Sequence, residues 1–198
     1  MIKEEIARLK EKKDFVILAH YYVDGAVQEI ADYVGDSYYL SKVATEVKSA
    51  NILFAGVMFM GESAKLLNPQ KHVYMADNFA DCPMAHMVDV ADIEKVREQY
   101  KDVAVVCYVN STAAIKALSD VCVTSSNAIK VVRKLKEKYI FFIPDNNLGQ
   151  YVAKQVPEKQ FIFHDGFCHV HKSIKAPLVI EAKRNHPGAL VLVHPECT

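Results

Sequence analysis

The sequence lacks several features that would place it in a class of protein at once. Its 24 basic and 24 acidic residues cancel, so no overall charge favours nucleic acid, an anionic membrane or a polyanionic partner. The longest apolar runs, 103–109 and 139–144, are about strand length, whereas a membrane helix needs roughly 20 residues. The charged stretch 1–13 contains no apolar signal core. These absences predict a cytoplasmic protein without a nucleic-acid or membrane partner.

Cysteines are few and scattered, and the sequence has no CxxC pair. There are five, an odd number whose wide spacing does not fit the disulfide framework of a secreted domain. Metal ligation, catalysis or burial remain as roles. Cys107 and Cys122 fall within apolar runs, which predicts that both are buried as small hydrophobic residues. Cys197 has no assigned role. P-loop, GxGxxG and HExxH motifs are also absent.

Short β-rich runs alternate with helix-periodic stretches along the chain. Strands are predicted near residues 15–19, 52–57, 72–76, 103–109, 139–143, 160–163 and 189–193. Helices are predicted near residues 26–34, 38–49, 61–67, 90–100, 112–119, 126–138, 147–154 and 173–185. Because 51% of the 198 residues are hydrophobic, the chain can bury a core. The alternation predicts an α/β fold with mainly parallel sheets.

The two halves of the chain repeat one another. FVILAHYY aligns with VAVVCYVN, and NPQKHVYMAD aligns with VPEKQFIFHD. Ser125 follows Ser37 by 88 positions, and Cys168 follows Cys82 by 86. The alternative is that unrelated α/β units look alike, because strands and helices of similar length recur in many folds. The repeat predicts pseudo-repeated three-layer α/β/α units with short parallel sheets.

The expected organisation has three parts. Residues 1–86 form the first α/β/α unit, residues 87–172 form the second, and residues 173–198 start a third, because GALVLVHPE resembles the opening strand again. The same spacing would place a third equivalent cysteine beyond Thr198. We therefore expect two complete units and a third that is only begun, as in a C-terminally truncated chain.

Polar residues follow the apolar strands in equivalent places, where open α/β sheets bind ligands. The three pairs are His20 and Tyr22, Tyr108 and Asn110, and His194 and Glu196. In an extended segment this i, i+2 spacing puts both side chains of a pair on one side. A single histidine in such a loop is more often an ordinary surface residue. Recurrence in all three units nevertheless predicts one shared pocket.

Ser37 and Ser125 stand at the beginning of predicted helices. Helix capping alone would explain both hydroxyls, since an N-cap side chain satisfies backbone N–H groups. The same N–H groups and the helix dipole would also stabilise a phosphate or carboxylate. The duplicated serines therefore suit a ligand with two or more acidic groups.

Cys82 and Cys168 lie in loops after the last strand of each predicted unit. Pseudo-symmetry would carry one thiolate from each unit toward a common axis, which implies a three-cysteine site. Three thiolates leave one iron of a 4Fe–4S cluster open to substrate, and zinc with three cysteines and a water is the alternative. His171 follows Cys168 by three residues. Its candidate roles are metal ligation, a hydrogen bond to a metal-binding residue, and proton donation near the metal. We favour contact with the substrate.

Eight short motifs resemble the quinolinate synthase family in order and spacing along the whole chain. They are LAHYY, GDS, DCPMA, YVNS, TSSNA, PDNNLG, GxCxVH and HPEC. The resemblance implies a pseudo-threefold arrangement of α/β/α units around a central 4Fe–4S cluster, held by one cysteine from each unit. In this sequence those cysteines are Cys82 and Cys168.

The resemblance also implies an activity. The family condenses iminoaspartate with dihydroxyacetone phosphate, losing phosphate and water, and forms quinolinate for NAD biosynthesis; functional coupling to L-aspartate oxidase is a further expectation. Glu196 would act as general base, with Tyr22 and His20 handling protons and His171 as a further candidate for that role. The expected substrate-binding residues are His20, Tyr22, Ser37, Tyr108, Asn110, Ser125, His171, His194 and Glu196. With the third cluster cysteine absent from this chain, we expect impaired activity.

Two rival functions fit the same residues. One is a non-catalytic anion-binding or metal-storage module with structural cysteines. The other is a zinc-dependent aldolase or dehydratase acting on a phosphorylated triose, which would use the same serines and Glu196. Product formation separates the first from an enzyme, and metal analysis separates the second.

Overall fold

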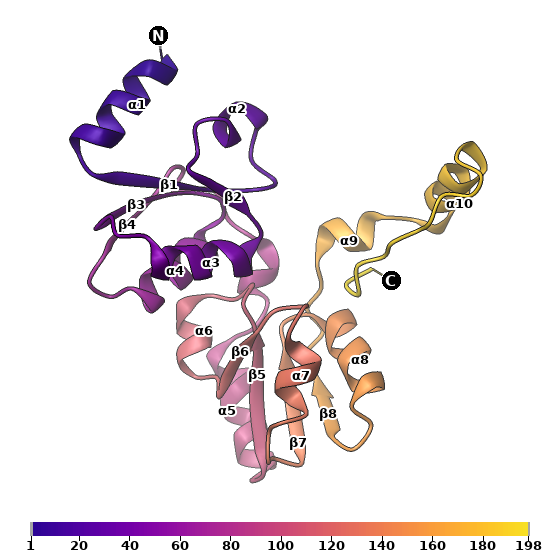
Figure 1. The fold of residues 1–198 in the computed structure, drawn as a ribbon. Coiled ribbons are helices and arrows are strands. Elements are labelled where there is room, and N and C mark those ends of the chain that lie inside the picture. The colour runs from indigo at the N-terminus through magenta and orange to yellow at the C-terminus, as the bar shows by residue number, and fades with distance from the viewer. Residues whose placement is uncertain (1, 198) are drawn as a thin grey trace. The chain divides into compact units, whose positions relative to one another are not determined.

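Two four-stranded parallel sheets dominate the computed structural model, which describes residues 2–197 (Figure 1). The chain divides into two compact units, Met1–Cys82 and Pro83–Thr198. Each unit contains one of the sheets with helices around it. The predicted α/β class with repeated units is therefore confirmed, while the three-part division at residues 86 and 172 stays a prediction.

The first unit has the strand order β2-β1-β3-β4, with all neighbouring strands parallel. Its strands are β1 (Phe15–His20), β2 (Tyr33–Gly35), β3 (Asn51–Ala55) and β4 (His72–Met75). Its helices are α1 (Ile2–Lys12), α2 (Gly25–Gln28), α3 (Ser37–Glu46) and α4 (Met58–Leu67). Helices α3 and α4 lie side by side on one side of this sheet, and α1 and α2 lie on the other (Figure 1).

The second unit repeats this topology with the order β6-β5-β7-β8, again parallel. Its strands are β5 (Val103–Tyr108), β6 (Val121–Val123), β7 (Tyr139–Ile143) and β8 (Gln160–Phe163). Its helices are the 3-10 helix η1 (Pro83–His86), α5 (Val90–Gln99), α6 (Ala113–Ala117), α7 (Ala128–Val132), α8 (Asn146–Gln155), α9 (His169–Ser173) and α10 (Ala176–Asn185).

The repeat has a constant spacing of 88 residues throughout both sheets. Each strand of the second sheet begins 88 positions after its counterpart: Val103 after Phe15, Val121 after Tyr33, Tyr139 after Asn51, and Gln160 after His72. The spacing of 86 between Cys82 and Cys168 therefore departs from the register of the sheets. It reflects a loop that is two residues shorter between β8 and Cys168, which follows Phe163 by five positions, than between β4 and Cys82, which follows Met75 by seven.

The second sheet is covered on both faces, which explains its continuously apolar strands. All six residues of β5 are buried, as expected for a parallel strand between two layers of helices. On one face Val105 and Cys107 join a buried cluster with Ile93 of α5 and Ile115 of α6. On the other face Phe142 lies against α8 at Gly149, where an added Cβ would come within 3.0 Å of its ring.

One aspartate in each unit extends the pairing of the central strand. The Asp32 backbone N–H donates to the Ile17 carbonyl at 2.9 Å, while its carboxylate accepts from the Ile17 N–H at 2.8 Å. Asp120 makes the same two bonds to Val105, at 3.0 and 2.7 Å. Because a buried strand N–H needs a partner, both aspartates have a structural role that their repeated spacing would have revealed.

Several predicted boundaries are wrong. The helix predicted at 26–34 is only the short α2 followed by β2, and the helix predicted at 126–138 is only α7. Both short edge strands, β2 and β6, were missed because three residues give too little periodicity. The strand predicted at 189–193 does not form. Its apolar residues are extended and exposed, and a strand requires a hydrogen-bonding neighbour.

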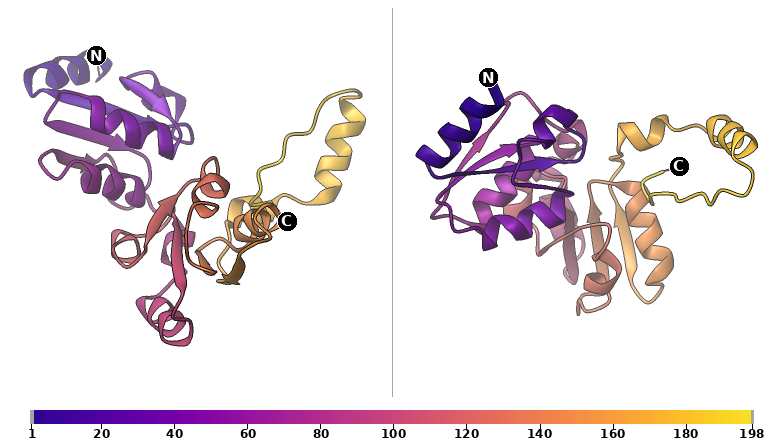
Figure 2. Two further views of the ribbon diagram at one scale, coloured as in Figure 1. Left: turned by 60° about the horizontal axis from the view of Figure 1, so that its bottom comes forward. Right: turned by 45° about the horizontal axis from the view of Figure 1, so that its top comes forward.

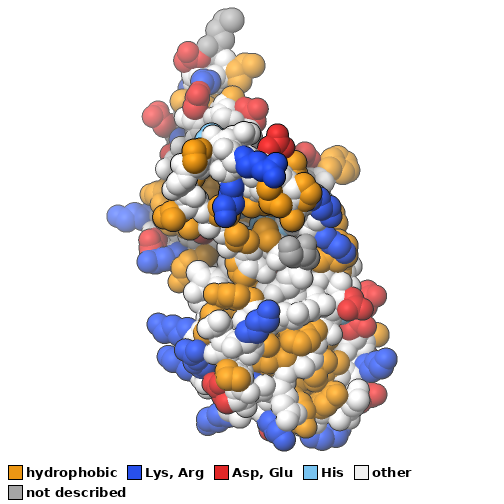
Figure 3. Space-filling model, turned by 90° about the vertical axis from the view of Figure 1, so that its right-hand side faces the viewer, with side chains coloured by type: hydrophobic (Ala, Val, Ile, Leu, Met, Phe, Trp, Pro, Cys, Tyr) orange, Lys and Arg blue, Asp and Glu red, His pale blue; other side chains and the backbone are white. Residues whose placement is uncertain are grey.

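Helix α10 and the residues directly after it stand away from the second sheet in all three ribbon views (Figures 1 and 2), and the chain then returns to α8 at Glu196. Helix α10 buries none of its residues, and Leu190 and Leu192 are 90% and 94% exposed. Figure 3 looks onto the face that carries α10 and shows hydrophobic side chains among the charged ones. Within residues 2–197, no helix combines the length and apolar character needed to cross a bilayer.

Candidate active site

The loop that carries Cys168 is fixed against the end of β7. Gly166 forms a parallel bridge with Asp145, and its carbonyl accepts the Asn146 N–H at 2.8 Å. A Cβ on Gly166 would lie 2.3 Å from the Pro144 carbonyl oxygen, so the close approach of the two segments requires glycine here. This contact positions the following Cys168.

Asp145 connects α8 to the cysteine loop. It is fully buried, and its Oδ1 accepts the Leu148 N–H at 2.7 Å as the N-cap of α8. Its Oδ2 accepts the Cys168 N–H at 3.0 Å. The aspartate therefore satisfies backbone donors on two elements at once and orients the cysteine backbone.

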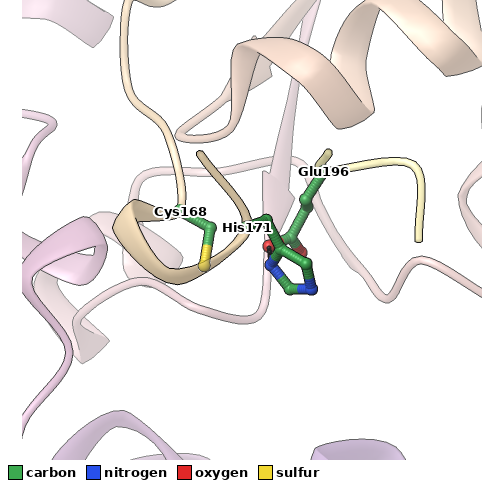
Figure 4. Close-up of side chains that lie close together, drawn as sticks. All are labelled: Cys168, His171 and Glu196. Atoms are coloured by element: carbon green, nitrogen blue, oxygen red, sulfur yellow. Dashed lines mark ion pairs between the residues drawn. The ribbon is translucent and has the colours of Figure 1, made fainter. Parts of the chain in front are cut away.

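Three side chains from two segments converge next to this loop (Figure 4). Cys168 precedes α9, His171 lies on α9, and Glu196 comes from the segment after α10. His171 Nδ1 is 3.0 Å from Glu196 Oε2, and Glu196 is only 2% exposed. His194 stacks on His171 with ring centroids 4.8 Å apart, and its Nδ1 lies 3.9 Å from Glu196 Oε1. The buried carboxylate thus lies beside two imidazoles.

The backbone of the C-terminal segment is held by its neighbours. The Asn147 amide on α8 donates to the Glu196 carbonyl at 3.1 Å, and the Glu196 N–H donates to His194 Nδ1 at 3.3 Å. Asn147 and Asp145 belong to the PDNNLG motif, to which sequence analysis assigned no role. Their place directly after a strand, where parallel sheets gather ligand-binding groups, is the signal that could have found them.

Burial shifts the proton affinities of this group. It raises the pKa of Tyr108 well above its ordinary value, and the neighbouring Glu196 carboxylate adds to the shift. Burial also raises the pKa of Asp145 to about 6, opposed by the Leu148 N–H, and raises the pKa of the Cys168 thiol. It lowers the pKa of His194. Tyr108 is therefore a neutral hydroxyl donor next to a buried carboxylate at neutral pH.

The convergent group can hold a metal. One ligand atom each from Cys168, His171 and Glu196 lies within 4.8 Å of the other two. Sulfur, nitrogen and carboxylate oxygen are all ligands of transition metals. This geometry allows Cys168 to bind a metal and leaves His171 close enough for ligation or for contact with a bound molecule; the metal-binding roles of Cys82 and Cys168 stay predictions.

A pocket of about 520 Å³ opens beside His194, a size suited to a small-molecule ligand. It lies between α8 and the segment after α10. Its lining residues are Asn147, Gln150, Tyr151, Lys154, Val193, His194, Pro195 and Cys197. Lys154 and Asn147 give it donors for an acidic group.

The first unit brings together a smaller set of the predicted residues. His20 ends β1, and its ring meets the Tyr22 ring edge-on at 4.6 Å. The Tyr22 N–H donates to His20 Nδ1 at 3.2 Å, and Tyr22 is 86% exposed. Burial lowers the pKa of His20, opposed by the Asp36 carboxylate. Tyr22 lies in the turn after β1 rather than in an extended strand, so the contact between the two rings does not come from the alternation of side chains along a strand that predicted it.

The capping interpretation of the two serines is wrong. The N-cap of α3 is Asp36, whose carboxylate accepts the Tyr39 N–H at 2.7 Å, and Ser37 is the first helical residue. Helix α7 begins only at Ala128, after the N-cap Asn127. A carboxylate outcompetes the serine hydroxyl as an acceptor at α3. The substrate-binding roles of both serines stay predictions.

The remaining predicted residues differ in their burial. Asn110 is half-buried in the bend after β5. Cys82 is half-buried at the end of the first unit, where its N–H donates to Asp81 at 2.7 Å. Cys107 is buried as predicted, whereas Cys122 is exposed, so that part of the prediction is wrong. Cys122 lies on the edge strand β6, which an apolar run alone does not reveal.

Comparison with known proteins agrees with the motifs. The family described as Quinolinate synthetase A protein matches residues 4–198. The chain is 59% identical to the quinolinate synthase of Fusobacterium nucleatum over 196 residues, which are 99% of this chain and 66% of that protein. It is 53% identical to the Caldicellulosiruptor saccharolyticus enzyme over 99% of this chain and 65% of that protein.

A third quinolinate synthase, from Clostridioides difficile, is 52% identical over 98% of this chain and 64% of its own length. The chain therefore spans just under two thirds of the length of these curated relatives. The family match covers nearly every residue, and the YVNS, PDNNLG, GxCxVH and HPEC motifs supply the residues of the convergent site. The chain belongs to the quinolinate synthetase A protein family.

Proposed function

We propose that this chain carries part of the active site of a quinolinate synthase, which condenses iminoaspartate with dihydroxyacetone phosphate. The observation that carries the proposal is the convergence of Cys168, His171 and the buried Glu196 at positions of the family motifs. The segment of Cys168 and His171 and the distant segment of Glu196 would not bring a carboxylate against an imidazole and a thiol for packing alone, since burying a carboxylate costs free energy.

The second unit would supply most of the proton chemistry. Glu196 acts as the general base, because it is buried beside His171 and His194, which orient it. Tyr108 donates a hydrogen bond to developing negative charge, since its hydroxyl stays protonated. His194 and Lys154 bind acidic groups of substrate at the neighbouring pocket.

The remaining predicted residues complete the proposed substrate site. In the first unit His20 and Tyr22 move protons and Ser37 binds substrate oxygens. In the second, Asn110 and Ser125 serve as further donors. A cytosolic location and functional coupling to L-aspartate oxidase also remain predictions of the family resemblance.

An iron–sulfur cluster would use Cys168 as one ligand and Cys82 as another. The half-buried Cys168 thiol, with His171 and Glu196 at ligand distance, fits a metal-binding role. When bound, such a cluster would supply an iron able to act as a Lewis acid toward a hydroxyl or carboxylate of substrate. The surrounding residues of this chain bind and orient the substrate and hold its protons.

The test is a chimera in which this chain replaces the matching part of the Fusobacterium nucleatum enzyme. After anaerobic reconstitution, we expect it to form quinolinate from the two substrates and to contain iron and sulfide. The 198-residue chain alone should form quinolinate far more slowly. A chimera that folds and binds iron but makes no quinolinate would refute the proposal.

A zinc-dependent aldolase or dehydratase is the second candidate, favoured by one observation. A mixed sulfur, nitrogen and oxygen donor set, as Cys168, His171 and Glu196 offer, is typical of a single zinc ion. Metal analysis of the anaerobically purified protein separates the two functions. Zinc without sulfide, together with cleavage of a phosphorylated triose, would favour this candidate.

A further inference from the structure

Two cysteines outside the proposed active site face each other across neighbouring strands. Cys107 of β5 and Cys122 of β6 are directly paired in the register of the second sheet. Paired residues of parallel strands project on the same face, and neighbouring strands lie about 4.8 Å apart. This separation falls within the range of about 4.4–6.8 Å between Cα atoms that a disulfide allows. Both thiols are free.

The two thiols differ in accessibility. Cys107 is fully buried among the apolar residues under α5 and α6, whereas Cys122 is exposed on the edge strand. A reagent from solvent therefore reaches Cys122 first. Cys107, on the neighbouring strand β5, is the residue paired with Cys122 in the sheet.

Polar groups surround this pair in a part of the unit that is otherwise apolar. Lys116 of α6 is only 8% exposed, and its charge acts on the Cys122 thiol. Ser111, 1% exposed, and Ser119, whose hydroxyl donates to the Ile115 carbonyl at 2.8 Å, lie near the Cys107 thiol, which itself donates to the Tyr108 carbonyl at 3.3 Å. A buried ammonium next to an accessible thiol stabilises the thiolate form.

The first unit shows that the fold does not require these groups. Eighty-eight positions earlier in the register, the paired residues are Ala19 and Val34. The positions that match Ser111, Lys116 and Ser119 hold Val23, Gln28 and Ala31. The first unit thus forms the same strand pair with apolar side chains and no lysine, so packing does not explain the thiols and the lysine of the second.

The proton affinities of the two thiols diverge. The pKa of Cys122 is lowered to about 7 by the interaction with the neighbouring Cys107 thiol and by the Lys116 charge, while burial opposes the shift. The pKa of Cys107 is raised, first by the same interaction and then by burial. Near neutral pH, Cys122 is therefore the nucleophile and Cys107 remains a thiol.

We propose that Cys122 and Cys107 form a reactive dithiol, in which exposed Cys122 is modified by hydroperoxides and Cys107 resolves the product as an intramolecular disulfide. Cys122 thiolate attacks one peroxide oxygen, the O–O bond breaks, and Cys122 becomes a sulfenic acid while hydroxide or alkoxide leaves. The Cys107 sulfur then attacks the Cys122 sulfur, the S–O bond breaks, and water leaves.

The overall reaction balances. Two thiols lose two electrons and two protons, and one hydrogen peroxide gains them to give two waters. A thiol reductant reverses the step by exchange. In a reducing compartment the disulfide would therefore be transient rather than structural.

The test treats the purified, fully reduced chain with hydrogen peroxide and maps its peptides by mass spectrometry without reduction. We expect a cross-linked peptide pair containing Cys107 and Cys122, lost again on adding dithiothreitol. Iodoacetamide at pH 7 should label Cys122 at least tenfold faster than Cys168. Cys168→Ser is the matched control and should leave the 107–122 cross-link unchanged.

Single variants separate the two roles. In Cys107→Ser a dimedone adduct should accumulate on Cys122, because no thiol resolves the sulfenic acid. In Cys122→Ser, Cys107 should stay unmodified. Lys116→Met should slow alkylation of Cys122 at pH 7 severalfold. Equal labelling of all five cysteines, or peroxide products that link Cys122 to other cysteines or to a second chain instead of Cys107, would overturn the proposal.

Discussion

The two units share a sheet topology and a constant spacing of 88 residues, yet they differ where side chains can do chemistry. Asp32 and Asp120 make the same backbone contacts in both. The Lys71 ammonium donates to the Ala44 and Val47 carbonyls, and Lys159 does the same to Leu135 and Glu137. Groups that hold the backbone are therefore duplicated.

The differences lie at helix starts and in the loops after the last strands. Helix α8 begins with the side-chain cap of Asp145, whereas its counterpart α4 begins at Val57 without one. The same carboxylate binds the Cys168 loop, which is two residues shorter than the loop of Cys82. The duplicated framework therefore tolerates loops that differ between the units. The second unit contains the convergent side chains Cys168, His171 and Glu196.

The largest effect should follow from removing the charge of Glu196. In the active chimera, Glu196→Gln keeps the shape but not the basicity, so we expect quinolinate formation to fall by about 10³-fold. Steady-state kinetics measures the loss. Glu181→Gln on the exposed helix α10 is the matched control, and an equal loss there would refute a specific role of Glu196.

The shared framework predicts equal losses of stability in the two units. Asp32→Ala and Asp120→Ala each leave a central strand N–H without its charged acceptor, which costs about 2–3 kcal/mol of unfolding free energy. Urea denaturation followed by circular dichroism measures both. Asp32→Asn and Asp120→Asn should each lose only about half as much unfolding free energy as the Ala variants, since the amide oxygen still accepts the strand N–H. A large loss in one unit only would break the structural equivalence.

Asp145 should make the second unit sensitive to pH. Its pKa is raised to about 6 in the folded state from 3.8, so the folded form binds a proton that the unfolded form has lost between these values. Unfolding free energy should therefore fall as pH rises from about 4 to 6, by about 2 kcal/mol from this group.

Asp145→Asn should remove that decline, because its side chain does not titrate. Denaturation series at pH 4, 5, 6 and 7 of the wild type and the variant measure the difference in slope. Asp165→Asn, an exposed position in the neighbouring loop that carries Cys168, is the control. An unchanged slope in Asp145→Asn would show that other groups set the pH dependence.

The smallest effect should come from giving the first unit the cap that it lacks. Val57 has an extended backbone with φ −93° and ψ 156°, which an N-cap aspartate adopts without strain. Val57→Asp should raise the unfolding free energy by about 1 kcal/mol. Denaturation measures the gain, and Val57→Ala separates it from loss of the valine side chain. A destabilised Asp variant would show that burial outweighs capping here.

Most of the framework could be predicted from the sequence, because it depends on local patterns. The long strands β1, β3, β5 and β7 were placed to within a residue or two, since their apolar runs are continuous. The edge strands β2 and β6 were not, because three residues give no period. Part of the candidate site was also accessible: Glu196, His171 and Cys168 were selected as polar groups after strands or next to a cysteine.

The sequence by itself determined the α/β class, the repeat and the family, because strand patterns and motif order are encoded along the chain. Only the tertiary structure decided which of those residues meet. It joined His171 to Glu196 across 25 positions, assigned the helix caps to Asp36 and Asp145, and paired Cys107 with Cys122. Such contacts depend on how strands associate and on which segments return to the sheet, and the spacing of residues along the chain does not contain that information.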